Sequence, residues 1–181
     1  MGWKPVGAPP PEPKYVMVSQ HTSNWDFVFM ILFASHFRVD VSWLGKASLF
    51  RFPFGGLLRA LGGIPVDRSA KHDLVAQMAG EFAKRDRLVI GIAPEGTRKY
   101  TDYWKSGFYA IARAASVPIW AMALDYAKKE CGFGIRVLPS GDVRADMDTL
   151  RAYYATQTCK FPAFTAPVRL KDESGTSALP G

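Results

Sequence analysis

The chain has 181 residues, of which 48% are hydrophobic and 22% charged, so it can form one compact domain with its own core and does not resemble a disordered protein. Its formal net charge of +7 implies an anionic partner, which could be nucleic acid, a phosphorylated substrate or an acidic membrane. The spacing of Cys131 and Cys159 indicates neither a zinc site nor a disulfide framework, and the longest apolar run, residues 27–34, is much shorter than the roughly 20 residues of a membrane-spanning helix.

Strand-like and helix-like segments alternate along the chain between two irregular ends. The proline-rich residues 1–13 predict an extended lead-in without secondary structure, and residues 165–181 predict a flexible tail around a single domain over 14–164. The predicted strands cover residues 15–19, 39–44, 63–67, 88–93, 118–124 and 133–138, and the predicted helices cover about 24–37, 48–60, 69–84, 105–115 and 145–157. This alternation indicates an α/β fold with a mostly parallel central sheet flanked by helices.

The run HTSNWD, residues 21–26, lies between the first predicted strand and the first predicted helix. Five residues turn an α-helix by about 500°, so His21 and Asp26 share a face only if the histidine precedes the helix. Asp26 in the first helical turn can then reach back to one ring nitrogen, which leaves the other free to take a proton from a hydroxyl. His21 is therefore a candidate general base and Asp26 its orienting carboxylate. The alternative is a simple helix cap, because Ser23 and Asp26 match a capping box.

Further polar residues follow the next predicted strands, with Lys46 after the second, Arg68 after the third, and Glu95 and Arg98 after the fourth. Ligands of open parallel sheets bind along the carboxyl edge of the strands, so we expect these side chains near His21. The strand order is open at this stage. A base beside a group of cations suggests a substrate that carries both a hydroxyl and a phosphate.

The loop APEGTRKY, residues 93–100, contains a glycine, a hydroxyl and an arginine immediately before a predicted helix. Arg98 can hold a phosphate through two parallel hydrogen bonds, which a lysine cannot do. Glu95, Gly96 and Thr97 are expected to structure the loop, with Glu95 bonding the backbone or pairing with Arg98. An ordinary loop with a solvated charge pair is the alternative.

The other two cations each have an ordinary alternative as well. Lys46 lies in GKASLF, which is not a phosphate-binding P-loop because Asp40 occupies the first glycine position and Ala47 follows the lysine. It can point at the same phosphate or be solvated at a helix start. Arg68 follows Asp67, and a local surface ion pair between them is the alternative to phosphate binding.

Residues 48–63 mix phenylalanines and leucines with Arg51 and Arg59. An amphipathic stretch of this kind can lie in an anionic membrane surface, with its arginines toward the headgroups and its aromatic rings in the acyl boundary. The alternative is a helix after Pro53 whose apolar side faces the protein core. This basic and aromatic patch is the expected contact with a membrane.

Together, HTSNWD, GGIPVDR with Lys46 before it, EGTR and the VPI of residues 117–119 resemble the four sequence blocks of the glycerophospholipid and lysophosphatidate acyltransferase family. The resemblance covers about residues 15–124 and implies a glycerol-3-phosphate acyltransferase-like fold. It implies that His21 is the general base, that Asp26 orients it, and that Arg98, Arg68 and Lys46 bind the acceptor phosphate. It also implies an acyl-CoA or acyl carrier protein thioester as cosubstrate, with no metal and no cofactor.

The expected reaction is therefore acyl transfer to the free hydroxyl of a lysophospholipid, foremost 1-acylglycerol-3-phosphate, in the cytoplasm at the inner face of the membrane. Nucleic acid is not an expected partner. Family members often carry an amino-terminal membrane-anchoring segment, for which residues 1–14 are too short and proline-rich, so surface helices are expected to contact the membrane. The alternatives are an O-acyltransferase for lyso-aminolipids of the ornithine or glycine type, and a noncatalytic basic protein that binds lipid surfaces or nucleic acid.

Overall fold

The computed structural model describes residues 2–66 and 71–174 of the chain. Within these residues the strands are β1 (Lys4–Val6), β2 (Lys14–Val18), β3 (Val41–Lys46), β4 (Gly63–Val66), β5 (Leu88–Ile92), β6 (Ile119–Asp125) and β7 (Glu130–Val137). The α-helices are α1 (Asn24–Phe37), α2 (Gly55–Ala60), α3 (Lys71–Lys84), α4 (Gly107–Ala114) and α5 (Val143–Tyr154), and the 3-10 helices are η1 (Ala47–Phe50) and η2 (Pro162–Phe164). None of the helices in this part of the chain is long and apolar enough to cross a membrane.

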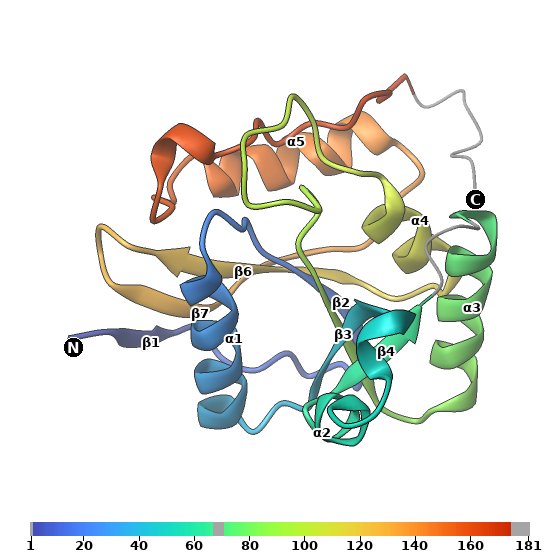
Figure 1. Cartoon of the computed structure of the whole chain (residues 1–181). Helices are drawn as coiled ribbons and strands as arrows, with labels where there is room; N and C mark the ends of the chain where they lie inside the picture. Colours follow the sequence, from blue (N-terminus) through green and yellow to red (C-terminus); the bar gives the residue numbers. More distant parts are fainter. Residues whose placement is uncertain (1, 67–70, 175–181) are drawn as a thin grey trace.

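The described strands form one sheet in the order β1-β7-β6-β2-β5-β3-β4 (Figure 1). Neighbouring strands are parallel except β6 and β7, which form an antiparallel hairpin. The predicted α/β fold with a mostly parallel sheet is therefore confirmed. In the register of the sheet Val18 of β2 lies beside Ile92 of β5 and Ala121 of β6, so the chain leaves all three strands at the same edge.

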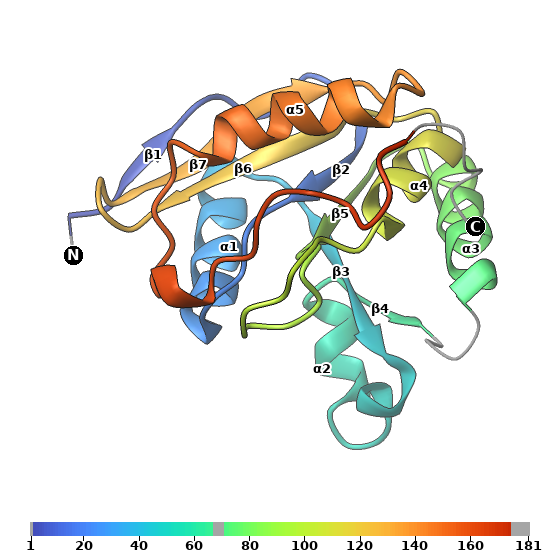
Figure 2. The same cartoon turned by 90° about the horizontal axis from the view of Figure 1, so that it is seen from above.

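The two faces of the sheet pack into separate hydrophobic cores, because the side chains of a strand alternate between its faces. In β2, Val16 and Val18 join the core made with α3, α4 and α5, whereas Tyr15 and Met17 join the core made with α1. Figure 1 shows α5 on one side of β6 and α1 on the other, and Figure 2 shows the same arrangement from above. Burial on both faces explains why β2 reads as an uninterrupted apolar run.

Both predicted irregular ends differ from the structure. The prediction of a lead-in without secondary structure is wrong for β1, which pairs in parallel with β7 at the edge of the sheet. The prediction of a flexible tail is wrong for residues 165–170, because Ala166, Val168 and Leu170 are buried in the core with α4 and α5. These apolar residues alternate with polar ones and prolines, so one side of an extended segment covers the core. Residues 175–181 of the predicted tail lie outside the described residues.

The single helix predicted over residues 48–60 is wrong, because the structure has η1, a turn and the short helix α2 in its place. Pro53 lies between them and has no backbone N–H to donate within a helix. Gly55 begins α2 with its Cα against the backbone of Phe50, a contact that leaves no room for a Cβ. The other predicted elements are present with shifted ends, and the predicted residues 67 to 70 lie outside the described part of the chain.

Candidate active site

His21 and Asp26 lie in contact at the carboxyl edge of the sheet, between the end of β2 and the first turn of α1. Nδ1 of His21 lies 3.3 Å from Oδ2 of Asp26, and the histidine side chain keeps 24% of its surface exposed whereas the aspartate keeps 6%. The contact through Nδ1 leaves Nε2 for another partner. The predicted arrangement of these two side chains is therefore confirmed by the geometry, and their chemical roles stay predictions.

Asp26 also begins the helix, so the capping alternative is present in the same residues. Ser23 is the N-cap and accepts a hydrogen bond from the backbone of Trp25, while Oδ2 of Asp26 accepts bonds of 2.8 Å from the backbone N–H groups of Thr22 and Ser23. These backbone bonds fix the carboxylate before any substrate arrives. The cap and the contact with His21 therefore coexist.

Tyr126 is a further partner of Asp26 that the sequence reading missed. It is the first residue after β6, and its hydroxyl donates a 2.6 Å hydrogen bond to Oδ1 of Asp26. Burial acts to raise the pKa of this carboxyl, but hydrogen bonds from the His21 ring, the Tyr126 hydroxyl and two backbone N–H groups outweigh it and hold the pKa below its usual value. Asp26 is thus an anion at neutral pH. The position of Tyr126 directly after a strand end is the signal that could have found it.

Glu95 joins the EGTR turn to the histidine loop. Its Oε1 accepts a 3.2 Å hydrogen bond from the backbone N–H of His21, and its Oε2 is buried without a hydrogen-bond partner among the described residues. Burial raises the pKa of Glu95 to about 7, an effect that the nearby Asp26 strengthens. Among the described residues Glu95 does not pair with Arg98, and the backbone group that it binds through Oε1 belongs to the histidine loop, not to its own turn as expected.

Arg98 lies on the same rim as His21 and donates from Nη1 to the side-chain oxygen of Asn24 at the start of α1. Thr97 accepts a hydrogen bond from the backbone of Lys99, and Gly96 has a φ of 65°, a left-handed conformation that favours glycine. The turn is therefore ordered by its own residues, as expected for Gly96 and Thr97. The guanidinium of Arg98 is brought to the mouth of the site.

Of the other two predicted cations, the structure describes Lys46 and not Arg68. Lys46 ends β3 with an exposed side chain and is not among the described residues that line the cavity beside His21. Arg68 lies outside the described residues.

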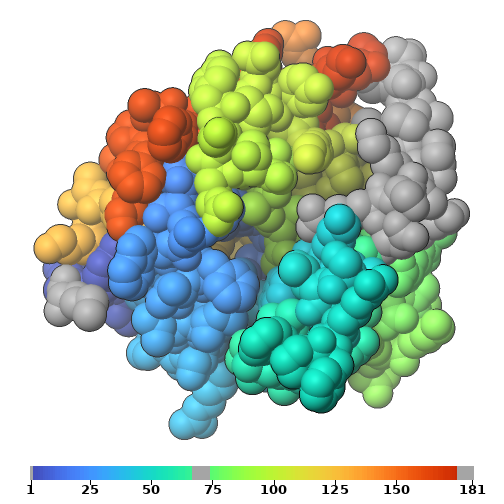
Figure 3. Space-filling view, viewed as in Figure 1, coloured from blue at the N-terminus to red at the C-terminus, as the bar shows by residue number. Residues whose placement is uncertain are grey.

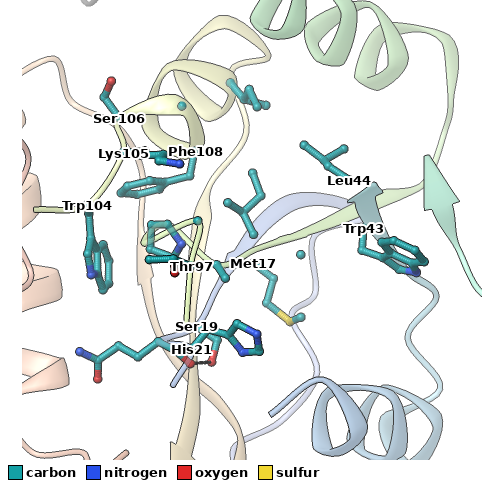
Figure 4. A pocket seen from close by; sticks show the side chains of 18 of the residues that line it. Met17, Ser19, His21, Trp43, Leu44, Thr97, Trp104, Lys105, Ser106 and Phe108 are labelled. Carbon is teal, nitrogen blue, oxygen red and sulfur yellow. Dashed lines mark hydrogen bonds between the residues drawn. The ribbon is translucent and has the colours of Figure 1, made fainter. Parts of the chain in front are cut away.

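The cavity beside His21 has a volume of about 1530 Å³. Figure 3 shows the hollow between α1, the loop that follows β5, and the segment of η1 and α2. The polar side chains of the lining include His21, Arg98 and Lys105. Figure 4 shows His21 and Lys105 together with Met17. Apolar side chains from β2, α1, β3 and α4 line the rest, among them Met17, Met30, Trp43, Phe108 and Ile111. The lining of the cavity thus combines a few cations with a larger set of apolar side chains.

Comparison with known proteins gives a family match over this site. A family model described as Acyltransferase matches residues 8–125, which include His21, Asp26 and the EGTR turn. The matched segment ends immediately before Tyr126.

Two individual proteins are also similar to this chain. A 1-acyl-sn-glycerol-3-phosphate acyltransferase from Saccharomyces cerevisiae is 30% identical over 113 residues, which are 58% of this chain and 36% of the yeast protein. The chain therefore spans little more than a third of the length of that relative. The crystal structure of the 1-acyl-sn-glycerophosphate (LPA) acyltransferase PlsC from Thermotoga maritima superimposes with a TM-score of 0.56 at 15% identity, over 86% of this chain and 73% of that one. At this identity the likeness concerns the fold.

Proposed function

The chain belongs to the acyltransferase family, and from that premise we propose that it moves a fatty acyl group from a thioester to the free hydroxyl of 1-acylglycerol-3-phosphate. The observation that carries the proposal is the contact of His21 with Asp26 at the mouth of a cavity that Arg98 also lines. The similarity to the yeast 1-acyl-sn-glycerol-3-phosphate acyltransferase supports the choice of acceptor.

In the proposed reaction His21 is the general base. Its Nδ1 is engaged by Asp26, so Nε2 accepts the proton of the acceptor hydroxyl as the oxygen attacks the thioester carbonyl. Asp26 holds the ring in place and stabilises the imidazolium that forms. The tetrahedral intermediate then collapses and expels the thiolate, which takes the proton back from His21. Both substrates react directly with each other, without a covalent enzyme intermediate.

We place the acceptor phosphate at Arg98, with Arg68 as a further ligand, and we leave out Lys46 because it does not line the described cavity. The bond from Arg98 to Asn24 supports this role, because it restricts the guanidinium on the rim before substrate binds. A phosphate monoester carries close to two negative charges at neutral pH, so it gains more from several cations than from one.

We place the acyl chain of the donor, carried by coenzyme A or acyl carrier protein, along the apolar part of the cavity. A single small ligand needs roughly 300–1,000 Å³, and the cavity of about 1530 Å³ exceeds that range. The extra volume supports simultaneous binding of an acyl chain and an acceptor. No cofactor takes part in the proposed reaction.

We also propose that residues 48–63 contact an anionic membrane surface, at the inner face of the membrane in the cytoplasm. Phe52, Phe54 and Leu57 keep 97%, 65% and 59% of their surface exposed, although they are apolar. Arg51 lies beside them with an exposed side chain. Exposed rings next to cations are the combination that binds the headgroup region of acidic bilayers.

The test is acyl transfer by the purified chain, with labelled acyl-CoA and 1-acylglycerol-3-phosphate, followed as formation of the diacyl product. His21→Ala is expected to reduce the rate by at least roughly 100-fold, as for the loss of a general base. His36→Ala, an exposed histidine on α1, is the matched control and should keep wild-type activity. If His21→Ala retains most of the activity, the histidine is not the base. A preference for lyso-ornithine lipid in the same assay would assign the chain to the aminolipid class of acceptors.

A further inference from the structure

Lys105 is a cation of the cavity that the reaction described above does not use. It precedes α4, and its side chain lies against the EGTR turn so closely that a Cβ added to Gly96 would meet Nζ at 2.5 Å. Figure 4 shows Lys105 and Thr97 lining the same cavity. The ammonium is therefore adjacent to the turn that carries Arg98, and the glycine makes that position accessible to it.

Other lysines near the described core have clear partners. Nζ of Lys14 donates to the carbonyl of Phe82, and Nζ of Lys128 lies 2.9 Å from Oδ2 of Asp125. Among the side chains that the structure describes, those of residues 2–66 and 74–174, none forms a hydrogen bond or an ion pair with the ammonium of Lys105. Its three donors are thus available to a ligand in the cavity.

The charges of the cavity favour an anion as that ligand. Its described carboxylates are Asp26 and Asp172. Both oxygens of Asp26 already accept hydrogen bonds, and Asp172 accepts two from Ser174. Three cations, Arg98, Lys105 and Lys171, line the cavity against these two carboxylates, so the described lining carries a net positive charge.

We propose that Lys105 binds the phosphate of a substrate together with Arg98, a role that rests on the acyl transfer proposed above. Arg98 belongs to the turn, and the Lys105 side chain lies against Gly96 of the same turn, so one phosphate at this turn can contact both. A guanidinium supplies a planar pair of donors and an ammonium supplies a compact point charge, and the two complement each other around one phosphate. The phosphate can come from the acceptor headgroup or from the carrier of the acyl donor.

Lys105→Met tests the charge, because methionine keeps an apolar stem over Gly96 and removes the ammonium. We expect kcat/KM to fall roughly 10- to 100-fold, as for loss of a charge-assisted hydrogen bond, and Lys105→Arg to recover most of it. Lys84→Gln, a surface lysine on α3, is the matched control and should behave as wild type. The melting temperature of Lys105→Met should stay within about 2 °C of wild type, which separates binding from a structural role of the side chain.

The source of the phosphate is distinguished by changing the acceptor. If the acceptor supplies it, the loss in Lys105→Met disappears with neutral 1-acylglycerol, and the KM for acyl-CoA stays unchanged. If the donor supplies it, the KM for acyl-CoA rises and the loss persists with the neutral acceptor. Kinetics equal to wild type for both substrates would overturn the proposal.

Calorimetric titration tests the proposal by measuring binding, without requiring the acyl-transfer reaction. Wild type and Lys105→Met are titrated with a short-chain 1-acylglycerol-3-phosphate and with coenzyme A. A roughly 10-fold weaker affinity of Lys105→Met for either probe supports phosphate binding, even if the wild-type chain transfers no acyl group and the proposed function fails. Equal affinities of the two proteins for both probes overturn it, whatever the activity assay shows.

Discussion

The hydroxyl of Tyr126, directly after β6, lies 2.6 Å from Oδ1 of Asp26, at the start of α1. Burial and the adjacent carboxylate raise the pKa of this phenol above its usual value, so it stays protonated and acts as the donor. This bond is made to Oδ1 of the aspartate, whereas His21 contacts Oδ2. A residue beyond the matched family segment therefore positions the candidate base through its partner.

We predict that Tyr126→Phe lowers the kcat of acyl transfer roughly 10-fold, because Asp26 loses a charge-assisted hydrogen bond and holds the His21 ring less firmly. The free energy of unfolding should fall by about 1–2 kcal/mol. Steady-state kinetics and urea unfolding measure the two effects. Tyr100→Phe is the control, since this exposed tyrosine has no hydroxyl bond among the described residues. A wild-type kcat in Tyr126→Phe would show that the backbone bonds suffice to position Asp26.

The two roles of the HTSNWD loop can be separated by a pair of substitutions. Ser23→Ala removes the N-cap side chain and should cost about 1 kcal/mol of stability, with kcat within a few-fold of wild type. Asp26→Asn should reduce kcat by at least roughly 100-fold, because an amide neither stabilises the imidazolium nor fixes the same ring tautomer. Chemical unfolding and steady-state kinetics on the same preparations test both. Equal catalytic losses in the two variants would mean that Asp26 acts only as a cap.

We predict that the stability of the protein depends on pH through the ionisation of Glu95. Its pKa is raised from 4.5 to about 7 in the folded protein, so the folded state binds this proton more tightly than the unfolded state. The resulting stability is fully present below pH 4.5 and is lost as the pH rises through about 7. Glu95→Gln keeps an acceptor for the His21 backbone and cannot ionise. Between pH 4.5 and pH 8 the free energy of unfolding of Glu95→Gln, measured with urea, should rise by about 2–3 kcal/mol relative to that of wild type. An unchanged difference between the two proteins over this range would contradict the prediction.

Membrane contact by residues 48–63 predicts a loss of vesicle binding when its most exposed rings are removed. The double substitution Phe52→Ser and Phe54→Ser should weaken binding to phosphatidylglycerol-containing vesicles by up to roughly 1,000-fold, because about 2 kcal/mol is lost for each ring withdrawn from the lipid. Sedimentation with vesicles measures the partition. Leu138→Ser is the control, because Leu138 is 53% exposed and follows the end of β7 at the opposite edge of the sheet. Equal sedimentation of the double variant and wild type would place the membrane contact elsewhere.

Local patterns were sufficient to predict the strand before His21 and the helix after it. The apolar run of β2 and the capping box at Ser23 each depend on neighbours within a few residues. The contact between His21 and Asp26 followed from the same local geometry. By contrast, the approach of Glu95 to His21 depends on the pairing of β2 with β5, which lie about 70 residues apart in the sequence.

Residues outside local patterns were missed for the same physical reason. Tyr126 reaches Asp26 only because β6 lies beside β2, and nothing in the sequence gives this order. Lys105 reaches the EGTR turn because the loop after β5 folds back on itself, a path without regular periodicity. The sequence predicts a tail for the buried segment that contains Val168, because prolines and polar residues interrupt the apolar pattern that its packing reveals.

The ring of Trp3, just before β1, packs edge to face against Tyr126 at 5.0 Å between centroids and also stacks on Phe29 at 4.1 Å. The strand β1 is thus linked through one aromatic contact to the hydroxyl that donates to Asp26. Loss of the Trp3 ring would therefore loosen Tyr126 and lower turnover, while every group expected to touch lipid remained in place.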